Sequence, residues 1–142
     1  MGTRMRILLD RGAFMPTRAH ETDAGLDLMT PHPAFLASGG KLVIDTGVHI
    51  ELPTGYFGKI ESKSGLNVNY GIVSCGGVID EGYQGSIAVV LYNLSKDMYV
   101  FEAGDKIAQL IIQPYAAPEL ELVSWFDVET ERGSAGFGST GR

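Results

Sequence analysis

The sequence predicts an all-β fold made of short strands, arranged as a sandwich, a barrel or a jelly roll. β-Branched and aromatic residues gather in short runs. Turn residues interrupt these runs roughly every 8–12 positions. No stretch keeps an apolar 3.6-residue period long enough for a regular helix. We find no internal repeat and no linker in the 142 residues, so one compact unit is expected.

The expected strands follow in chain order from a first one that begins within residues 23–28. The next are expected within 41–52, 56–61, 86–92, 106–112 and 122–128. The turns between them fall at residues 31–33, 39–40, 53–55, 93–95 and 104–105, which are rich in Pro, Gly, Asn and Ser. A single helical turn fits only after Ser64.

Composition and charge restrict the function classes. The hydrophobic fraction of 44% argues against disorder, and no apolar run approaches the roughly 18 residues of a membrane span. The lone Cys75 excludes an internal disulfide and fits a reducing compartment, so a cytoplasmic location is expected. A net charge of −6 argues against binding long nucleic acid. A small phosphate ligand needs only local cations or a divalent metal.

Two polar segments early in the chain carry candidate chemistry. In residues 23–28, Asp27 stands between two leucines and on the opposite face of the strand; it is either an ordinary solvent-facing residue or a water-mediated anchor for Mg²⁺. In residues 61–66, Lys63, Ser64 and Gly65 form either a loop or an anion site, with Ser64 as the N-cap of a helical turn.

The segment 76–85 is a glycine-framed hairpin with Asp80 and Tyr83 at its tip. Its glycines allow the main chain to approach the edge of a base. Asp80, beside an apolar pair, is a candidate general base. The alternative is a β-turn whose side chains have no function. Segment 104–110, which contains Gln109, indicates a structural role when taken alone.

The last segment, 132–141, carries several glycines together with a guanidinium, an aromatic ring and two hydroxyls. A frayed polar terminus is one interpretation. A flap that closes over a base and grips phosphates is the other.

In this order and spacing, the five segments together resemble the five motifs of trimeric-type dUTPases, a family that shares its fold with dCTP deaminases. The resemblance runs from Ala24 to Gly141. It implies a dUTPase-like distorted jelly roll or β-barrel over residues 1–131, with a flexible Gly-rich C-terminal arm, 132–142, that closes over the site.

The resemblance also implies a role for each site residue. Asp27 would hold Mg²⁺ through water, and Asp80 would deprotonate the attacking water. Tyr83 would lie under the deoxyribose, and Phe137 would stack on the base. The other implied substrate contacts are Lys63, Ser64, Gly65 and Gln109 on the phosphate side, the main chain of Gly77, Val78 and Ile79 on uracil, and Arg132, Gly138, Ser139 and Thr140 in the arm.

The implied activity is the Mg²⁺-assisted hydrolysis of dUTP to dUMP and pyrophosphate by water attack on the α-phosphorus. This reaction limits uracil incorporation into DNA and supplies dUMP for thymidylate synthesis. The resemblance further implies a homotrimer whose sites are shared between subunits, with no role for a membrane or for long nucleic acid.

Two positions depart from the family pattern. Lys63 stands where many members have Arg, which replaces a bidentate fork by a point charge. Ala135 replaces a common glycine of the arm. Deamination is disfavoured because Val90 occupies the position of the deaminase glutamate. A regulatory module that senses dUTP and engages a protein partner, and a purely structural jelly-roll subunit, are the alternatives from other classes.

Overall fold

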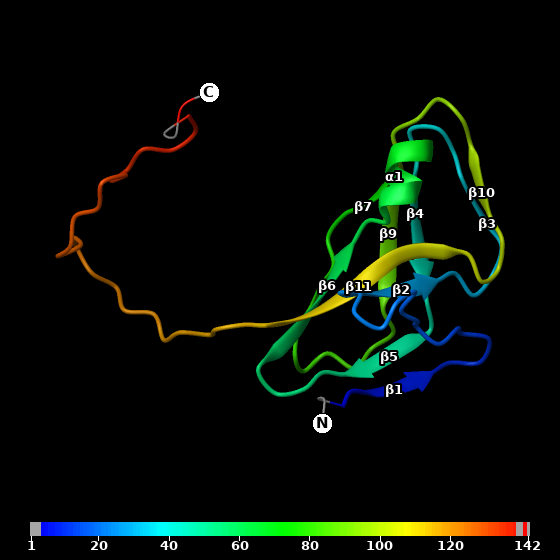
Figure 1. The fold of residues 1–142 in the computed structure, drawn as a ribbon, viewed down its shortest axis with the longest axis horizontal. Helices are drawn as coiled ribbons and strands as arrows, with labels where there is room; N and C mark the ends of the chain where they lie inside the picture. The colour runs from blue at the N-terminus through cyan, green and yellow to red at the C-terminus, as the bar shows by residue number, and fades with distance from the viewer. Residues whose placement is uncertain (1–3, 139–140, 142) are drawn as a thin grey trace.

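The computed structural model describes residues 4–138 and 141, which form a mostly β body and an extended C-terminal segment (Figure 1). The strands are short, as expected. They are β1 (Arg6–Leu9), β2 (Gly25–Met29), β3 (Ala34–Leu36), β4 (Lys41–Asp45), β5 (Val48–Glu51), β6 (Tyr56–Glu61), β7 (Ile72–Ser74), β8 (Val78–Ile79), β9 (Ala88–Asn93), β10 (Tyr99–Phe101) and β11 (Lys106–Pro114).

Four small antiparallel sheets build the body. The largest has the order β2-β11-β6-β8, and a second has the order β4-β9-β7; β1 pairs with β5, and β3 pairs with β10. Neighbouring strands in these sheets are far apart in sequence, so the body closes by long-range pairing. The predicted all-β class is confirmed.

A single apolar core lies between the sheets. It combines aliphatic side chains that alternate inward along the strands. Its fully buried large members include Leu28, Leu36, Ile44, Ile72, Ile87, Leu91, Phe101, Ile107 and Leu110. Within the described part of the chain, no helix is long and apolar enough to cross a membrane.

Two expected elements differ in detail. The expected strand over 41–52 is broken into β4 and β5 at Thr46 and Gly47, where Gly47 takes φ +69°. The single turn expected after Ser64 is a seven-residue helix, α1 (Ser64–Tyr70). It ends at Gly71, whose φ of +67° places its N–H on the carbonyls of Leu66 and Asn67. The sequence does not reveal the full helix because most of its side chains are exposed, and it therefore shows no apolar period.

The predicted strand over 122–128 is absent, and this expectation was wrong for the single chain. After Pro114 the chain leaves the sheets and runs away from the body (Figure 1). Its large apolar side chains are exposed, with Leu122 at 99% and Phe126 at 86%. An extended segment becomes a strand only when a second strand pairs with its N–H and C=O groups. The division at residue 131 remains a prediction.

Candidate active site

Asp27 is the most deeply buried charged side chain of the predicted site, with its residue only 3% exposed. Both of its neighbours in β2, Leu26 and Leu28, are also buried. The alternation predicted for this strand holds, but the face that carries Asp27 is covered. Its Oδ1 atom lies 2.5 Å from Nζ of Lys63, and its Oδ2 atom lies 3.1 Å from Nζ of Lys106. The solvent-facing alternative for Asp27 is therefore excluded.

The two lysines control the charge state of this carboxyl. Burial by itself raises the pKa of Asp27, but hydrogen bonds and charges from Lys63 and Lys106 outweigh burial and hold the pKa below its ordinary value. Asp27 is therefore an anion throughout the physiological range. Each lysine is also a fixed positive charge beside that anion.

A β-bulge brings Lys106 to this place. In the ladder between β11 and β2, Lys106 pairs with Met29 and Ala108 pairs with Leu28, so the register shifts at Ile107. The extra residue moves Lys106 onto the same face as Gln109 and Asp27, which a regular strand would not do. The bulge therefore builds the ion pair.

Gln109 lies directly opposite Asp27 on β2 and opposite Glu61 on β6. Its Nε2 atom donates to the carbonyl oxygen of Ser62 at 3.0 Å. Its side chain rests on Gly25, where an added Cβ would collide with Oε1 of Gln109. A glycine at position 25 is thus required for this rotamer, and the carboxamide is held beside the Asp27 cluster.

Ser64 and Gly65 open α1, which is separated from the end of β6 by two residues. The predicted N-cap role of Ser64 was wrong: Lys63 is the N-cap, with extended φ and ψ of −83° and 124°, and no side chain caps the helix. Ser64 is the first helical residue instead. A Cβ added to Gly65 would meet nothing within 4 Å, so this glycine leaves the main chain open to an approaching group.

The hairpin over residues 76–85 depends on Gly76 and Gly77, which take φ values of +78° and +94°. At Gly77 an added Cβ would stand 2.5 Å from Cβ of Ile60, while its carbonyl accepts the N–H of Ile60 at 2.8 Å. β8 follows at once and pairs with β6 through Ile79 and Gly58. The hairpin is thus tied closely to the largest sheet.

Asp80 follows β8 and lines a cavity of about 510 Å³. The other lining residues are Phe57, Val78, Glu81, Gly82 and Tyr115. The N–H of Tyr83 donates to the Asp80 carbonyl at 2.9 Å, which closes the turn. Asp80 therefore lines a hollow whose wall combines apolar and aromatic side chains with a second carboxylate, that of Glu81.

Glu81 fixes the base of this turn. Its Oε1 atom accepts the N–H of Gly55 at 2.5 Å and the hydroxyl of Tyr115 at 3.0 Å. Because the hydroxyl of Tyr115 donates to the Glu81 carboxylate, the pKa of Tyr115 is raised. One carboxylate thereby joins the hairpin to the β5–β6 turn and to the residue that begins the C-terminal segment.

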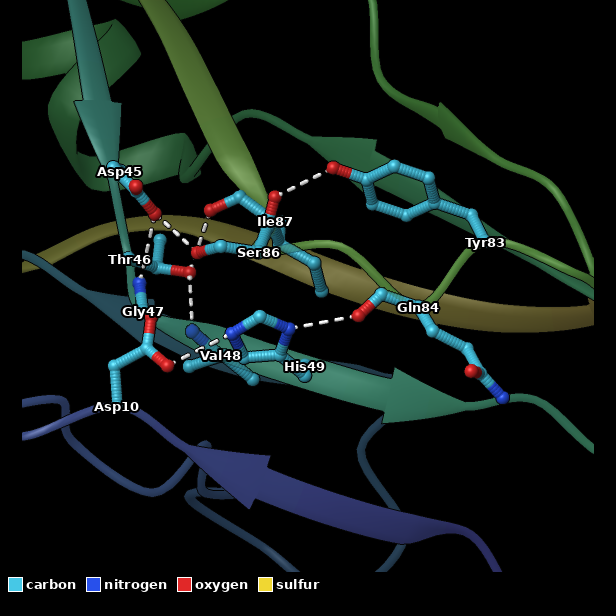
Figure 2. Close-up of polar contacts among 10 residues, drawn as sticks. All are labelled: Asp10, Asp45, Thr46, Gly47, Val48, His49, Tyr83, Gln84, Ser86 and Ile87. Carbon is cyan, nitrogen blue, oxygen red and sulfur yellow. Dashed lines mark hydrogen bonds and ion pairs between the residues drawn. The ribbon is translucent and has the colours of Figure 1, made fainter.

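Tyr83 is 44% exposed and donates its hydroxyl proton to the carbonyl of Ser86 at 2.8 Å (Figure 2). An added Cβ at Gly85 would stand 2.5 Å from the Tyr83 hydroxyl oxygen. The ring is thus folded back over the segment that follows it, with the rest of its surface open.

The arm does not touch the body through any hydrogen bond of the residues described. Arg132 donates from Nε to the Ala135 carbonyl at 2.9 Å and from a terminal nitrogen to that of Gly136 at 3.4 Å. Phe137 is fully exposed, and Gly138 has φ +83°. Ser139 and Thr140 lie outside the described residues.

Within one chain the predicted residues form separate groups. Asp27, Gln109 and Lys63 lie together, and Ser64 is adjacent. Asp80 lies one residue beyond the Ile79–Gly58 pair, at the other edge of the β2-β11-β6-β8 sheet. With strands about 4.8 Å apart and residues rising about 3.3 Å, Asp80 and Asp27 are on the order of 15–20 Å apart. The arm forms a third group.

The comparisons with known proteins agree with this arrangement of motifs. The profile of the dUTPase family matches residues 11–141. The mouse deoxyuridine 5'-triphosphate nucleotidohydrolase is 40% identical over 142 residues, which is 99% of this chain and 87% of that protein.

The chain belongs to the dUTPase family.

Solved structures of related dUTPases confirm the fold. A mutant dUTPase of Staphylococcus bacteriophage 80alpha with dUpNHpp superposes with a TM-score of 0.92 at 32% identity, covering 99% of this chain and all of the other. A mutant dUTPase from phage phi11 of S. aureus has a TM-score of 0.83 at 31% identity over 89% of this chain and all of the other. That phage protein coordinates a structural Mg(II) ion.

Asp27 is the carboxylate of the predicted site that could lie near a Mg²⁺ ion. Across residues 4–138 and 141, no three His, Cys, Asp or Glu side chains form a metal-binding group. Mg²⁺ keeps several waters and is commonly held by one or two carboxylates plus substrate phosphates. Both oxygens of Asp27 contact a lysine ammonium group, so Asp27 could hold the ion only through water.

Three residues that contact the predicted site or its neighbouring segments were not predicted from the sequence: Lys106, Glu81 and His49. Lys106 was missed because a bulge cannot be read from alternation. Glu81 and His49 were missed because their partners are brought to them only by the fold; these partners are Gly55, Tyr115, Asp10 and Gln84. The one available signal for Glu81 was its position next to Asp80, the candidate general base.

Proposed function

We propose that the hydrolysis of dUTP by this dUTPase proceeds by in-line attack of a water on the α-phosphorus, with Asp80 as the general base, and yields dUMP and pyrophosphate. The observation that carries this proposal is the position of Asp80 on the wall of a cavity of about 510 Å³ beside a glycine hairpin. A positioned general base contributes roughly 10²–10⁴-fold to the rate.

The residues around Asp27 would bind the triphosphate. Lys63, Ser64 and Gln109 supply donors to the triphosphate, and Asp27 would hold Mg²⁺ through water. When bound, the ion neutralises charge that develops on the pyrophosphate leaving group. Fixed donors lower the barrier most where they need no reorganisation, and the Ser62 and Gly25 contacts keep Gln109 in one rotamer.

Selection of the nucleotide falls to the hairpin and Tyr83. The main chain of Gly77, Val78 and Ile79 would pair with the edge of uracil, and cytosine would leave buried groups unpaired, each at about 1–3 kcal/mol. The 5-methyl group of thymine would meet rigid backbone, because Gly77 has no room to move against Ile60. Tyr83 would close the sugar site against a 2′-hydroxyl, and Phe137 would cover the base.

A complete site needs more than one chain. Asp27 and Asp80 of one chain are on the order of 15–20 Å apart, which is too far for both to act on the α-phosphorus of one bound nucleotide. The arm lies away from both residues (Figure 1). We therefore infer a homotrimer in which one subunit gives Asp27, Ser64 and Gln109, the second gives the Asp80 hairpin, and the third gives the arm. The exposed apolar residues of 120–128 favour a partner surface.

A pyrophosphate-release assay on dUTP, dCTP, dTTP and UTP, each with Mg²⁺ or with excess chelator, tests the proposal. We expect rapid release from dUTP with Mg²⁺ and little from the other three nucleotides. Equal cleavage of all four would reject the base-reading role of the hairpin. Tight binding of dUTP without pyrophosphate release would instead support the nucleotide-sensing regulatory module.

A mixing experiment tests the shared site. Asp80→Asn subunits and subunits that lack 132–142 are each expected to be inactive. If sites are shared, refolding the two together restores turnover, because a truncated subunit supplies Asp80 and an Asp80→Asn subunit supplies the arm. If every site belonged to a single chain, the mixture would stay inactive.

A further inference from the structure

His49, in β5, bridges two segments that are distant in sequence (Figure 2). Its Nδ1 atom lies 2.7 Å from the carbonyl oxygen of Gln84, and its Nε2 atom lies 3.0 Å from Oδ1 of Asp10. The side chain is 24% exposed, so the ring is largely enclosed. No role in the proposed chemistry requires this histidine, yet it contacts the residue that follows Tyr83.

Both partners of the ring are hydrogen-bond acceptors. A neutral imidazole has one N–H and can donate to only one of them, whereas the imidazolium donates to both. The Gln84 carbonyl and the Asp10 carboxylate accordingly raise the pKa of His49 above its ordinary value. The protonated ring is the form that satisfies the observed geometry.

Among the other charged groups around the ring, Asp45, at the end of β4, adds a further negative charge that favours the protonated form. Arg6 of β1 and Glu51 of β5 line the same cavity as His49 and pair with each other at 2.6 Å. Leu8, opposite His49 in β1, is apolar, and the segment 83–87 contributes the uncharged Gln84.

The segment that His49 contacts carries Tyr83. The hydroxyl of Tyr83 donates to Ser86, whose own hydroxyl donates to Asp45, and Thr46 donates to the Ile87 carbonyl at 2.7 Å (Figure 2). Asp45 has a lowered pKa, chiefly because of the Ser86 hydrogen bond, so it stays charged near neutrality. Among the contacts drawn in Figure 2, the two made by the His49 ring are the ones that change with protonation near neutral pH.

We propose that His49 is a positioning residue for Tyr83 and thereby a determinant of how strictly this dUTPase rejects ribonucleotides. The proposal rests on the proposed role of Tyr83 at the deoxyribose. The protonated ring ties Gln84 to Asp10 and holds Tyr83 rigidly in the space of a 2′-hydroxyl. When the ring loses its proton, one of its nitrogens faces an acceptor without a hydrogen, and the segment loosens.

The direction of the pH effect follows from the raised pKa. The link is fully present below the ordinary value of about 6.5 and is lost as pH rises through the higher pKa of the folded state. Rejection of UTP is therefore expected to weaken as pH rises through the raised pKa of His49. The uracil and triphosphate groups titrate alike in dUTP and UTP, so the ratio of their kcat/KM values isolates the protein's contribution.

The experiment measures that ratio from about pH 5.5 to about pH 9 for the wild type, His49→Gln and His32→Gln. We expect the wild-type preference for dUTP to fall about threefold to tenfold across the range, the equivalent of one hydrogen bond. His49→Gln is expected to show the lowered preference at every pH. His32, whose ring contacts the Pro33 carbonyl in a different turn, supplies the matched control and should behave as wild type.

A His49→Gln variant with the wild-type ratio and pH profile would overturn the proposal. If that variant fails to fold, Asp10→Asn keeps His49 and removes a negative charge, so the pH at which the preference falls should move downward; an unchanged midpoint would equally overturn the proposal.

Nuclear magnetic resonance separates this proposal from the role of Tyr83. The amide signals of Gln84 and Gly85 should titrate together with the His49 ring and lose that titration in His49→Gln. If Tyr83→Ala rejects UTP as well as the wild type does, the role of Tyr83 at the sugar is wrong, while this titration still shows whether His49 fixes the segment at Gln84. Amide shifts of Gln84 and Gly85 that do not follow the titration of the ring would show that His49 does not fix this segment.

Discussion

Lys106 places its ammonium 3.1 Å from the carboxylate of Asp27, although the two residues would face opposite sides of a regular β11–β2 ladder. The bulge at Ile107 turns Lys106 onto the Asp27 face. With Lys63 on the other oxygen, the buried carboxylate is compensated on both sides. The arrangement sets the charge of the Asp27 cluster, which is the predicted phosphate side of the site.

Replacing Lys106 by Met should raise the pKa of Asp27 and lower the free energy of unfolding at neutral pH. Because the folded pKa of Asp27 is depressed, its contribution to stability is present above about pH 3.9 and lost as pH falls through the folded pKa. In the variant the folded pKa lies closer to the unfolded value, so this contribution is smaller and the difference from the wild type shrinks as pH falls. Lys106 is half exposed, so we expect only about 1 kcal/mol at pH 7.

Urea unfolding at several pH values and one protein concentration measures the effect. Lys59→Met is the matched control, because Lys59 pairs with Glu61 on an exposed surface and should change stability by less than about 0.5 kcal/mol. Equal effects of the two variants at every pH would contradict the role assigned to Lys106.

Asp80→Asn should retain dUTP binding and lose turnover by roughly 10²–10⁴-fold, because an amide cannot accept the proton of the attacking water. Calorimetric titration with a non-hydrolysable dUTP analogue and the pyrophosphate assay measure the two properties separately. Retained turnover would remove Asp80 from its role as base.

Gly77→Ala should destabilise the hairpin by about 2–4 kcal/mol, because it combines φ of +94° with a Cβ 2.5 Å from Ile60. Gly76→Ala is the matched control: its φ is +78°, but an added Cβ there meets nothing within 4 Å, so about 1–2 kcal/mol is expected. Thermal unfolding of both variants gives the comparison, and equal losses would show that the contact with Ile60 does not matter.

Glu81→Ala should reduce turnover of dUTP, because it frees the Asp80 turn from Gly55 and from Tyr115. Tyr115→Phe removes only one of the two hydrogen bonds and should have the smaller effect. Loss of the Glu81 charge should also lower the pKa of Tyr115, which absorbance titration of the phenol can measure. A larger loss in Tyr115→Phe than in Glu81→Ala would reverse the assignment.

Deleting residues 132–142 should leave the unfolding temperature nearly unchanged, because the described part of this segment makes its hydrogen bonds within the extended C-terminal segment. Turnover should fall severely, since Arg132 and Phe137 would no longer close over the nucleotide. Thermal unfolding and the pyrophosphate assay decide the matter together. Full activity in the truncated protein would instead support the interpretation of this segment as a frayed terminus.

The sequence by itself determined the β class, the turn positions and the residue types that the site needs. Alternating apolar residues and turn chemistry are local properties, and each of the five motifs is a continuous stretch of sequence. Both can therefore be recognised from the sequence alone. Strand β6 was predicted with its observed bounds. The full length of α1 and the loss of a strand at 122–128 were not, because the first lacks an apolar face and the second depends on a pairing partner.

The tertiary structure decided which of these residues meet. Burial of Asp27 between two lysines, the hold of Glu81 on Gly55 and the bridge of His49 between Asp10 and Gln84 all join segments far apart in the chain. Such contacts follow from sheet order, a single bulge and glycines at positive φ. Local sequence specifies which chemical groups are available, but long-range strand pairing sets the distances between them. Those distances determine the pKa of a carboxyl or imidazole group and the contacts that it makes.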